Sequence, residues 1–290
     1  MRLRPILVIL ILAALATVAC GAPQEVSIGS GGKIGGAETP PETRVEPVDV
    51  AAVLARAEAG DTAGQRELAL LYSRGQAVKL DQVEAARWMR AAADQGDAEA
   101  QHDLGLMYQN GLGVEQDEAE ALVWLHKAAD QGLAAAQFNL GLAYAQGRGA
   151  EQDFEQAASW YRAAAERGNG FAQHNLGVMY DTGDGVAQDY AEALVWYRKA
   201  SERNVHQANF NIGVLYAEGR GVPQDRIEAV VWFTRSAWGG NEGADPAITH
   251  LFESMTAEEK KLAIERAKTE GQITDTPIDV FGEPLRDPAG

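Results

Sequence analysis

Residues 172–200 read AQHNLGVMYDTGDGVAQDYAEALVWYRKA, and this arrangement of residue types occurs in five tandem copies along the chain. The tryptophans that mark the copies are 36 residues apart, at Trp88, Trp124, Trp160, Trp196 and Trp232. A repeat of this length is typical of helix pairs that stack into an array, each pair burying its apolar face against the next. The sequence therefore predicts an all-α solenoid of antiparallel helix pairs.

The copy at residues 98–133 shows how one unit is predicted to fold. Its first half has apolar residues three and four positions apart, as on one face of a helix, and Gly111 then ends that helix. Asp117 is placed to be the N-cap acceptor of a second helix, and Glu120 to be its reciprocal partner. Trp124 belongs to the buried stripe of this second helix.

A glycine lies inside the first predicted helix of four units, at Gly105, Gly141, Gly177 and Gly213. Each of these glycines costs about 1 kcal/mol of helix stability relative to alanine. Because the same cost recurs in one column, we expect a neighbouring helix to lie close to the backbone there.

Residues 181–192, DTGDGVAQDYAE, resemble a calcium-binding loop with Asp181, Asp189 and Glu192 at its first, ninth and twelfth positions. However, the third and fifth positions, which need oxygen ligands, are glycines, and the sixth, which needs glycine, is valine. The other units have an aspartate equivalent to Asp189, at Asp81, Asp117, Asp153 and Asp225. We therefore interpret Asp189 as a helix cap and expect no calcium site.

The composition is that of a soluble globular protein, with 46% apolar and 23% charged residues and a formal net charge of −17. No run of basic residues is present, which argues against nucleic acid or anionic lipid as the main partner. A single cysteine excludes an internal disulfide framework and any zinc site with several cysteine ligands.

Histidine and motif patterns give no support for catalysis. His102 and His174 are equivalent positions two units apart, about 20 Å if each unit advances about 10 Å, so they cannot share a metal. No phosphate-binding G-x-x-x-x-G-K, no H-E-x-x-H and no Ser-His-Asp arrangement is found. We predict no catalytic residues, no metal and no cofactor.

The chain begins MRLRPILVILILAALATVAC, with two arginines before a short apolar run, which predicts a signal peptide at residues 1–19. The residues before Cys20 resemble a bacterial lipobox, so Cys20 is the predicted lipidation site. The alternative is ordinary cleavage that leaves a free thiol. Gly21 is not the aspartate that tends to retain lipoproteins at the inner membrane. The expected location is thus the periplasmic face of the envelope, with a lipid anchor in the outer membrane.

The rest of the chain divides into four predicted segments. Residues 20–47 form a Gly/Pro/Ser-rich tether, and residues 48–241 form the array, beginning with a half-repeat cap. The five predicted units are 62–97, 98–133, 134–169, 170–205 and 206–241. A helical cap follows at 242–272, in which Thr256 and Glu259 predict a capping box, and 273–290 is predicted to be a disordered tail.

The repeated pattern A-x-x-x-L-G-x-x-Y, G-x-G-V, D, A-x-x-W-Y-x-x-A-A resembles the Sel1-like repeat, a relative of the tetratricopeptide repeat. The first unit departs from it at Ala69 and at Gln76. The resemblance implies a right-handed superhelix whose first helices line a concave side. The family includes cysteine-rich members with reported enzymatic activity, but those cysteines are missing here.

Variable side chains on the first helices are the candidate binding residues. His102, Phe138, His174 and Phe210 share one column, and Gln109 and Asp181 share a second column on the same face. We predict an envelope-anchored scaffold that binds a protein or peptide there and meets the membrane only through its lipid anchor. One alternative is that the aromatic residues only pack between repeats. Another, by family analogy, is a hydrolase of cell-wall or lactam substrates.

Overall fold

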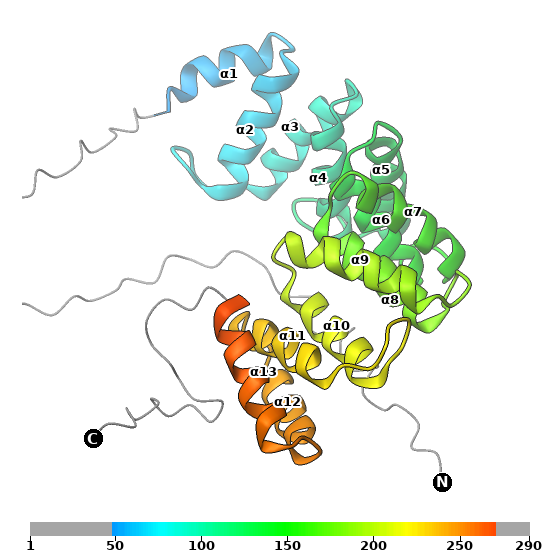
Figure 1. Cartoon of the computed structure of the whole chain (residues 1–290). Coiled ribbons are helices and arrows are strands. Elements are labelled where there is room, and N and C mark those ends of the chain that lie inside the picture. Colours follow the sequence, from blue (N-terminus) through cyan, green and yellow to red (C-terminus); the bar gives the residue numbers. More distant parts are fainter. Residues whose placement is uncertain (1–47, 271–290) are drawn as a thin grey trace, which may run out of the picture. The chain divides into compact units, whose positions relative to one another are not determined.

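The computed structural model describes residues 48–270, which form thirteen α-helices and no β-strand (Figure 1). Consecutive helices pack against each other as antiparallel pairs. The predicted all-α solenoid of helix pairs is therefore confirmed. The predicted signal peptide at 1–19, Cys20, the tether at 20–47 and the tail at 273–290 lie outside the described residues.

Each repeat contributes two helices of thirteen residues. The first helices are α2 (Thr62–Arg74), α4 (Ala98–Asn110), α6 (Ala134–Gln146), α8 (Gly170–Thr182) and α10 (His206–Glu218). The second helices are α3 (Gln82–Asp94), α5 (Glu118–Asp130), α7 (Phe154–Glu166), α9 (Tyr190–Glu202) and α11 (Arg226–Trp238). The array is preceded by α1 (Val50–Glu58) and followed by α12 (Ala244–Glu253) and α13 (Ala257–Glu270).

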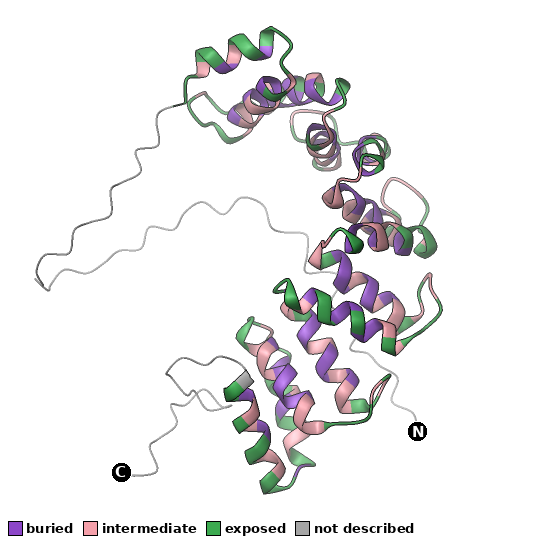
Figure 2. Cartoon of the chain, turned by 45° about the horizontal axis from the view of Figure 1, so that its top comes forward, coloured by how far each residue is buried: buried purple, intermediate pink, exposed green. Residues whose placement is uncertain are grey.

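The core follows the columns that the repeat pattern predicts. One column of the first helices is fully buried, at Leu68, Leu104, Leu140, Leu176 and Ile212. Alanines of the second helices face it and are equally buried, which lets the helices approach closely. Figure 2 shows the buried residues on the sides where helices face each other. Each helix therefore packs against the helices that precede and follow it in sequence, both within its repeat and in the next one.

The aspartates singled out in the sequence do cap the second helices. Asp117 Oδ1 accepts hydrogen bonds at 3.0 Å from the backbone nitrogens of Ala119 and Glu120. Asp189 makes the same two bonds at the start of α9, so its carboxylate serves the helix terminus. No cluster of His, Cys, Asp or Glu within residues 48–270 could hold a metal ion.

The prediction that Glu120 is the reciprocal capping partner of Asp117 is wrong. The backbone N–H of Asp117 donates to the carbonyl of Tyr108 at 3.0 Å, so it is not free to bond Glu120. Glu120 instead accepts a hydrogen bond of 2.8 Å from the indole nitrogen of Trp124. The aspartate therefore closes the loop between the two helices of a unit, and the glutamate satisfies the buried tryptophan.

In the second to fifth repeats, the turn between the paired helices has two glycines, and each is glycine for a different reason. Gly111 ends α4 with φ of 66°, a left-handed conformation that other residues rarely adopt. Gly113 also has positive φ, and a Cβ there would lie 1.8 Å from the carbonyl oxygen of Gln82 in the preceding repeat. The second glycine therefore lets the turn touch the neighbouring unit.

The array ends in helices that do not repeat the pair geometry. Both α12 and α13 pack on α11, and not mainly on each other. Arg266 on α13 donates to Glu228 on α11 at 2.7 Å. The predicted reciprocal capping of Thr256 and Glu259 is present at the start of α13. None of the described helices has the length and apolar character needed to cross a membrane.

Candidate functional site

Side chains of the first helices that lie beside the buried leucine column form one partly exposed surface, which we call the first-helix face. Its aliphatic column is Leu70, Leu106, Leu142, Val178 and Val214. Next to it lies a polar column of Glu67, Asp103, Asn139, Asn175 and Asn211. The predicted binding residues belong to two further columns of this face, so the first-helix face is the candidate binding site.

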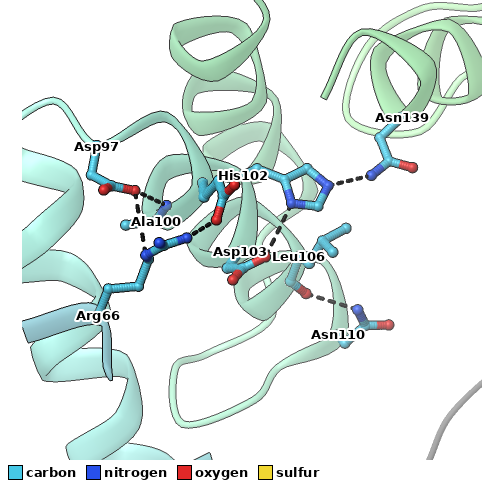
Figure 3. A network of polar contacts seen from close by, with 9 residues as sticks. Arg66, Asp97, Ala100, His102, Asp103, Leu106, Asn110 and Asn139 are labelled. Carbon is cyan, nitrogen blue, oxygen red and sulfur yellow. Dashed lines mark hydrogen bonds and ion pairs between the residues drawn. The ribbon is translucent and has the colours of Figure 1, made fainter. Parts of the chain in front are cut away.

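Two histidines connect adjacent first helices across this face. Asn139 on α6 donates through Nδ2 to His102 Nε2 on α4 at 2.9 Å, and His102 Nδ1 lies 3.0 Å from Asp103 (Figure 3). The same arrangement recurs two repeats later. Asn211 on α10 donates to His174 Nε2 on α8 at 3.2 Å. These bonds join consecutive repeats on the side that the helices present outward.

The surroundings of His102 are ionic. Arg66 on α2 forms ion pairs with Glu99 and, at 3.9 Å, with Asp97, as the close-up in Figure 3 shows. Asp97 also caps α4, since its Oδ1 accepts a hydrogen bond of 2.7 Å from the backbone of Ala100. The Glu99 side chain is 62% exposed, so its ion pair with Arg66 contributes little to stability.

The surroundings of His174 are uncharged, and the histidine itself is buried. Its ring is only 7% exposed and lies 5.8 Å from the ring of Tyr197. Burial lowers the pKa of His174, while the hydrogen bond to Asn175 partly opposes this shift. With Asn211 donating to Nε2, the ring is the neutral tautomer that donates from Nδ1 to Asn175 at 3.2 Å.

Two tyrosines of the second helices reach this face through the glycine column. A Cβ on Gly141 would lie 2.5 Å from the Tyr161 ring, and one on Gly177 would lie 2.6 Å from the Tyr197 ring. The expected close approach at these glycines is therefore confirmed. The hydroxyl of Tyr161 bonds to Asn175, and burial raises the pKa of Tyr161 to about 12.

Equivalent positions in other repeats have no hydroxyl to offer. Leu125 faces Gly105, and Phe233 faces Gly213. The repeat therefore folds with either an apolar residue or a tyrosine in this column. The tyrosine hydroxyls add polar groups to the first-helix face between the third and fifth repeats.

Asp181 is an acidic residue near the C-terminal end of α8. Its Oδ2 accepts a hydrogen bond of 3.3 Å from Tyr197, and its Oδ1 lies 3.9 Å from Nη1 of Arg220. Burial raises the pKa of Asp181, an effect that Arg220 and the Tyr197 hydrogen bond oppose and nearby Glu218 reinforces. The pKa of Tyr197 is raised well above its usual value by burial and by Asp181.

An aromatic cluster lies beside this polar network. Phe138 on α6 has its ring 5.9 Å from Tyr161 and 6.2 Å from Phe171 on α8. Phe171 is 50% exposed, although it is a large apolar side chain. The other units have Ala63, Glu99, Ala135 and Gln207 at this position. The aromatic residue is therefore not required by the repeat itself.

The predicted binding residues lie at equivalent positions on consecutive first helices, but they also pack between repeats. Phe210 contacts Phe233 with ring centroids 5.1 Å apart, and His174 is almost fully covered. His102, Phe138, Gln109 and Asp181 are partly exposed. Their binding role stays a prediction, and His174 presents the least surface to a partner.

Sequence reasoning missed the tyrosines, the asparagine column and Phe171. A signal for each was present in the repeat alignment. The tyrosine column reads Met89, Leu125, Tyr161, Tyr197 and Phe233, and so changes from apolar to polar for two units only. The neighbouring column changes from acidic side chains to three asparagines over the same part of the array.

Constant helix lengths, glycine turns and aspartate caps define a tandem helical-repeat solenoid with a variable face. The sequence model of the Sel1 repeat matches residues 62–97, 98–133, 134–169, 170–205 and 206–241, more than half of the chain. The chain therefore belongs to the Sel1 repeat family.

Solved structures agree with this assignment. A protective antigen present in uropathogenic Escherichia coli strains, which displays an SLR fold, is 35% identical over 76% of this chain, with a TM-score of 0.69. The alignment spans 48% of that antigen, about half of its length. A Sel1 repeat protein from Oxalobacter formigenes is 31% identical, with 76% of this chain and 92% of that chain covered and a TM-score of 0.67. A comparison with curated proteins gives no significant match.

Proposed function

We propose that this protein is a binding scaffold that holds a protein or peptide segment on its first-helix face, and that it is not an enzyme. The proposal rests on three side chains that the repeat does not require in order to fold. Tyr161, Tyr197 and the half-exposed Phe171 replace residues that other repeats fill with leucine, phenylalanine or small and polar side chains. They are concentrated in adjacent repeats and on one face.

The chemistry of the face fits a polypeptide. Asparagine amides can both donate to and accept from the main chain of an extended segment. The aliphatic column and Phe171 offer apolar contacts for its side chains. Proteins of the Sel1 repeat family typically bind protein partners, which agrees with this use of the face.

Site-specific photocrosslinking tests the proposal. Benzoylphenylalanine replaces Phe171 in one protein and Val123 on α5 in the control, because Val123 is also about half exposed but lies on a second helix. We expect crosslinked protein or peptide from position 171 after irradiation of cells, and little from position 123. Crosslinks at position 123 alone, or at neither position, would contradict binding on the first-helix face.

We further propose that the protein is exported and anchored by lipid at Cys20, on the periplasmic side of the outer membrane. The support is the apolar run of residues 6–16 behind two arginines and the single cysteine that follows it. The experiment compares incorporation of a labelled lipid precursor into wild type and Cys20→Ser, followed by membrane fractionation. Equal labelling of the two proteins, or recovery of the wild type as a soluble species, would overturn the anchoring.

A further inference from the structure

The carboxylate of Asp181 is incompletely paired. A carboxylate offers about four lone-pair sites. Among the described residues, one side-chain hydrogen bond reaches it, the 3.3 Å bond from Tyr197. Its side chain is 20% exposed, so part of it remains open to solvent and to a ligand. Ser73, Gln109, Ala145 and Ala217 occupy the equivalent positions, so the charge belongs to the fourth repeat alone.

The nearest cation is held away from Asp181. Nη1 of Arg220 is 3.9 Å from Asp181 Oδ1, beyond hydrogen-bonding distance. The other end of this guanidinium pairs with Glu218. Its planar group lies 5.5 Å from the ring of Tyr190. Arg220 is therefore shared among Asp181, Glu218 and Tyr190 and does not hydrogen-bond the Asp181 carboxylate.

The local charge favours such a cation. Asp181 and Glu218 contribute two negative charges around Arg220, which contributes one positive charge. The whole chain has a formal net charge of −17, so a basic segment is also attracted at longer range. Asp181 is partly shielded from water. Salt therefore screens its attraction for a cation less than it would at a fully exposed carboxylate.

Phe171 and Asp181 lie on the same helix, and the distance between them determines how far apart two side chains of a bound segment must be to contact both. Ten residues along α8 correspond to about 15 Å at 1.5 Å per residue. An extended chain covers that length in about four or five residues at about 3.3 Å each. Asn175 lies between the two positions along α8.

We propose that the bound segment is basic, with a Lys or Arg side chain at Asp181 and an apolar side chain on Phe171 about four or five residues away. This inference rests on the proposed function, because it specifies the partner of the same face. Asp181 is the residue that selects the basic side chain, and Phe171 with Phe138 provides the apolar contact.

A random peptide display library, panned on the purified full-length chain in detergent, tests the inference. The expected result is enrichment of peptides with a basic residue four or five positions from an aromatic or large aliphatic one. Asp181→Asn keeps the size of the side chain and is expected to weaken these peptides at least tenfold. Asp94→Asn on α3 makes the same charge change at an exposed site on a second helix and is the control.

Replacing the basic residue of an enriched peptide by glutamine locates the contact. We expect the same loss of affinity for wild type, and no further loss when Asp181→Asn is combined with it. Circular dichroism confirms that each variant is folded. Enriched peptides without the basic residue, or with equal affinity for Asp181→Asn, would overturn this inference but leave the binding scaffold standing. A library with no enriched peptide would overturn both.

Discussion

His102 and His174 occupy equivalent positions two repeats apart, yet their surroundings differ in kind. Each ring accepts a hydrogen bond from an asparagine of the next first helix. Around His102 the neighbours are ionic side chains, whereas around His174 they are a buried tyrosine and the amides of two asparagines. Both histidines lie on first helices of thirteen residues that end at a left-handed glycine, so the difference comes from the side chains around them.

A residue of the second helix accounts for much of this difference. Leu125 fills the space against Gly105, and Tyr197 fills the equivalent space against Gly177 and adds a hydroxyl. That hydroxyl bonds to Asp181 and to Asn211, the residue whose amide donates to His174. A change at one buried column can therefore alter the outward face while the repeat keeps its fold.

The largest difference between the two regions is expected from adding a methyl group to the glycine column. Gly177→Ala places a Cβ 2.6 Å from the Tyr197 ring, whereas in Gly105→Ala the nearest side-chain atom is Leu125 Cγ at 3.0 Å. Overpacking costs about 1–3 kcal/mol, and the gain in helix propensity returns about 1 kcal/mol.

We expect Gly177→Ala to lose about 2 kcal/mol of unfolding free energy and Gly105→Ala to lose less than about 1 kcal/mol. Urea unfolding followed by circular dichroism measures both variants. Equal losses would show that the tyrosine region is packed no more tightly than the leucine region.

A smaller effect is expected from pH. The pKa of His174 is lower in the folded chain than its ordinary value of about 6.5. As the pH falls below 6.5, the unfolded chain therefore binds a proton before the folded chain does, and His174 makes stability decrease. His174→Gln should flatten the loss of stability between pH 7 and pH 5.

The comparison with wild type isolates this histidine. The pKa of His126 is also lowered by burial, and that of Asp181 is raised, but both groups are present in the two proteins. Thermal unfolding over a series of pH values provides the measurement. Parallel pH profiles for wild type and His174→Gln would refute the role given to the buried ring.

The smallest effect is expected in the ionic region. Glu99→Gln removes one of the two ionic partners of Arg66, and the glutamate side chain is 62% exposed. Exposed ion pairs contribute about 0–1 kcal/mol, so the loss of unfolding free energy should stay below about 1 kcal/mol. A loss above about 2 kcal/mol in urea unfolding would mean that this region is as tightly built as the surroundings of His174.

Most of the fold could be predicted because every column is sampled in five consecutive units. The buried position of Leu104 and the cap at Asp117 follow from patterns that each unit repeats. The role of Glu120 could not be predicted in this way. Its usual partner, the backbone N–H of the cap residue, is bonded to the Tyr108 carbonyl, and only the closed helix pair creates that bond.

The candidate site was predicted only in part. Helical spacing places His174 on the correct face, but it does not show how far the next repeat covers the ring. That cover depends on the rotation between repeats, which spacing along one helix does not contain. Tyr197 was missed for a related reason, since it belongs to a core column and only its hydroxyl reaches the face.

The two ends of the array differ in a way that bears on the order of unfolding. One helix of nine residues, α1, covers the first repeat, whereas α12 and α13 both pack on α11 of the last repeat. In an array held together by nearest neighbours, opening starts where the fewest contacts must be broken. Amide hydrogens of α1 and α2 should therefore exchange with solvent before those of α11, so that unfolding of the array begins at its N-terminal end.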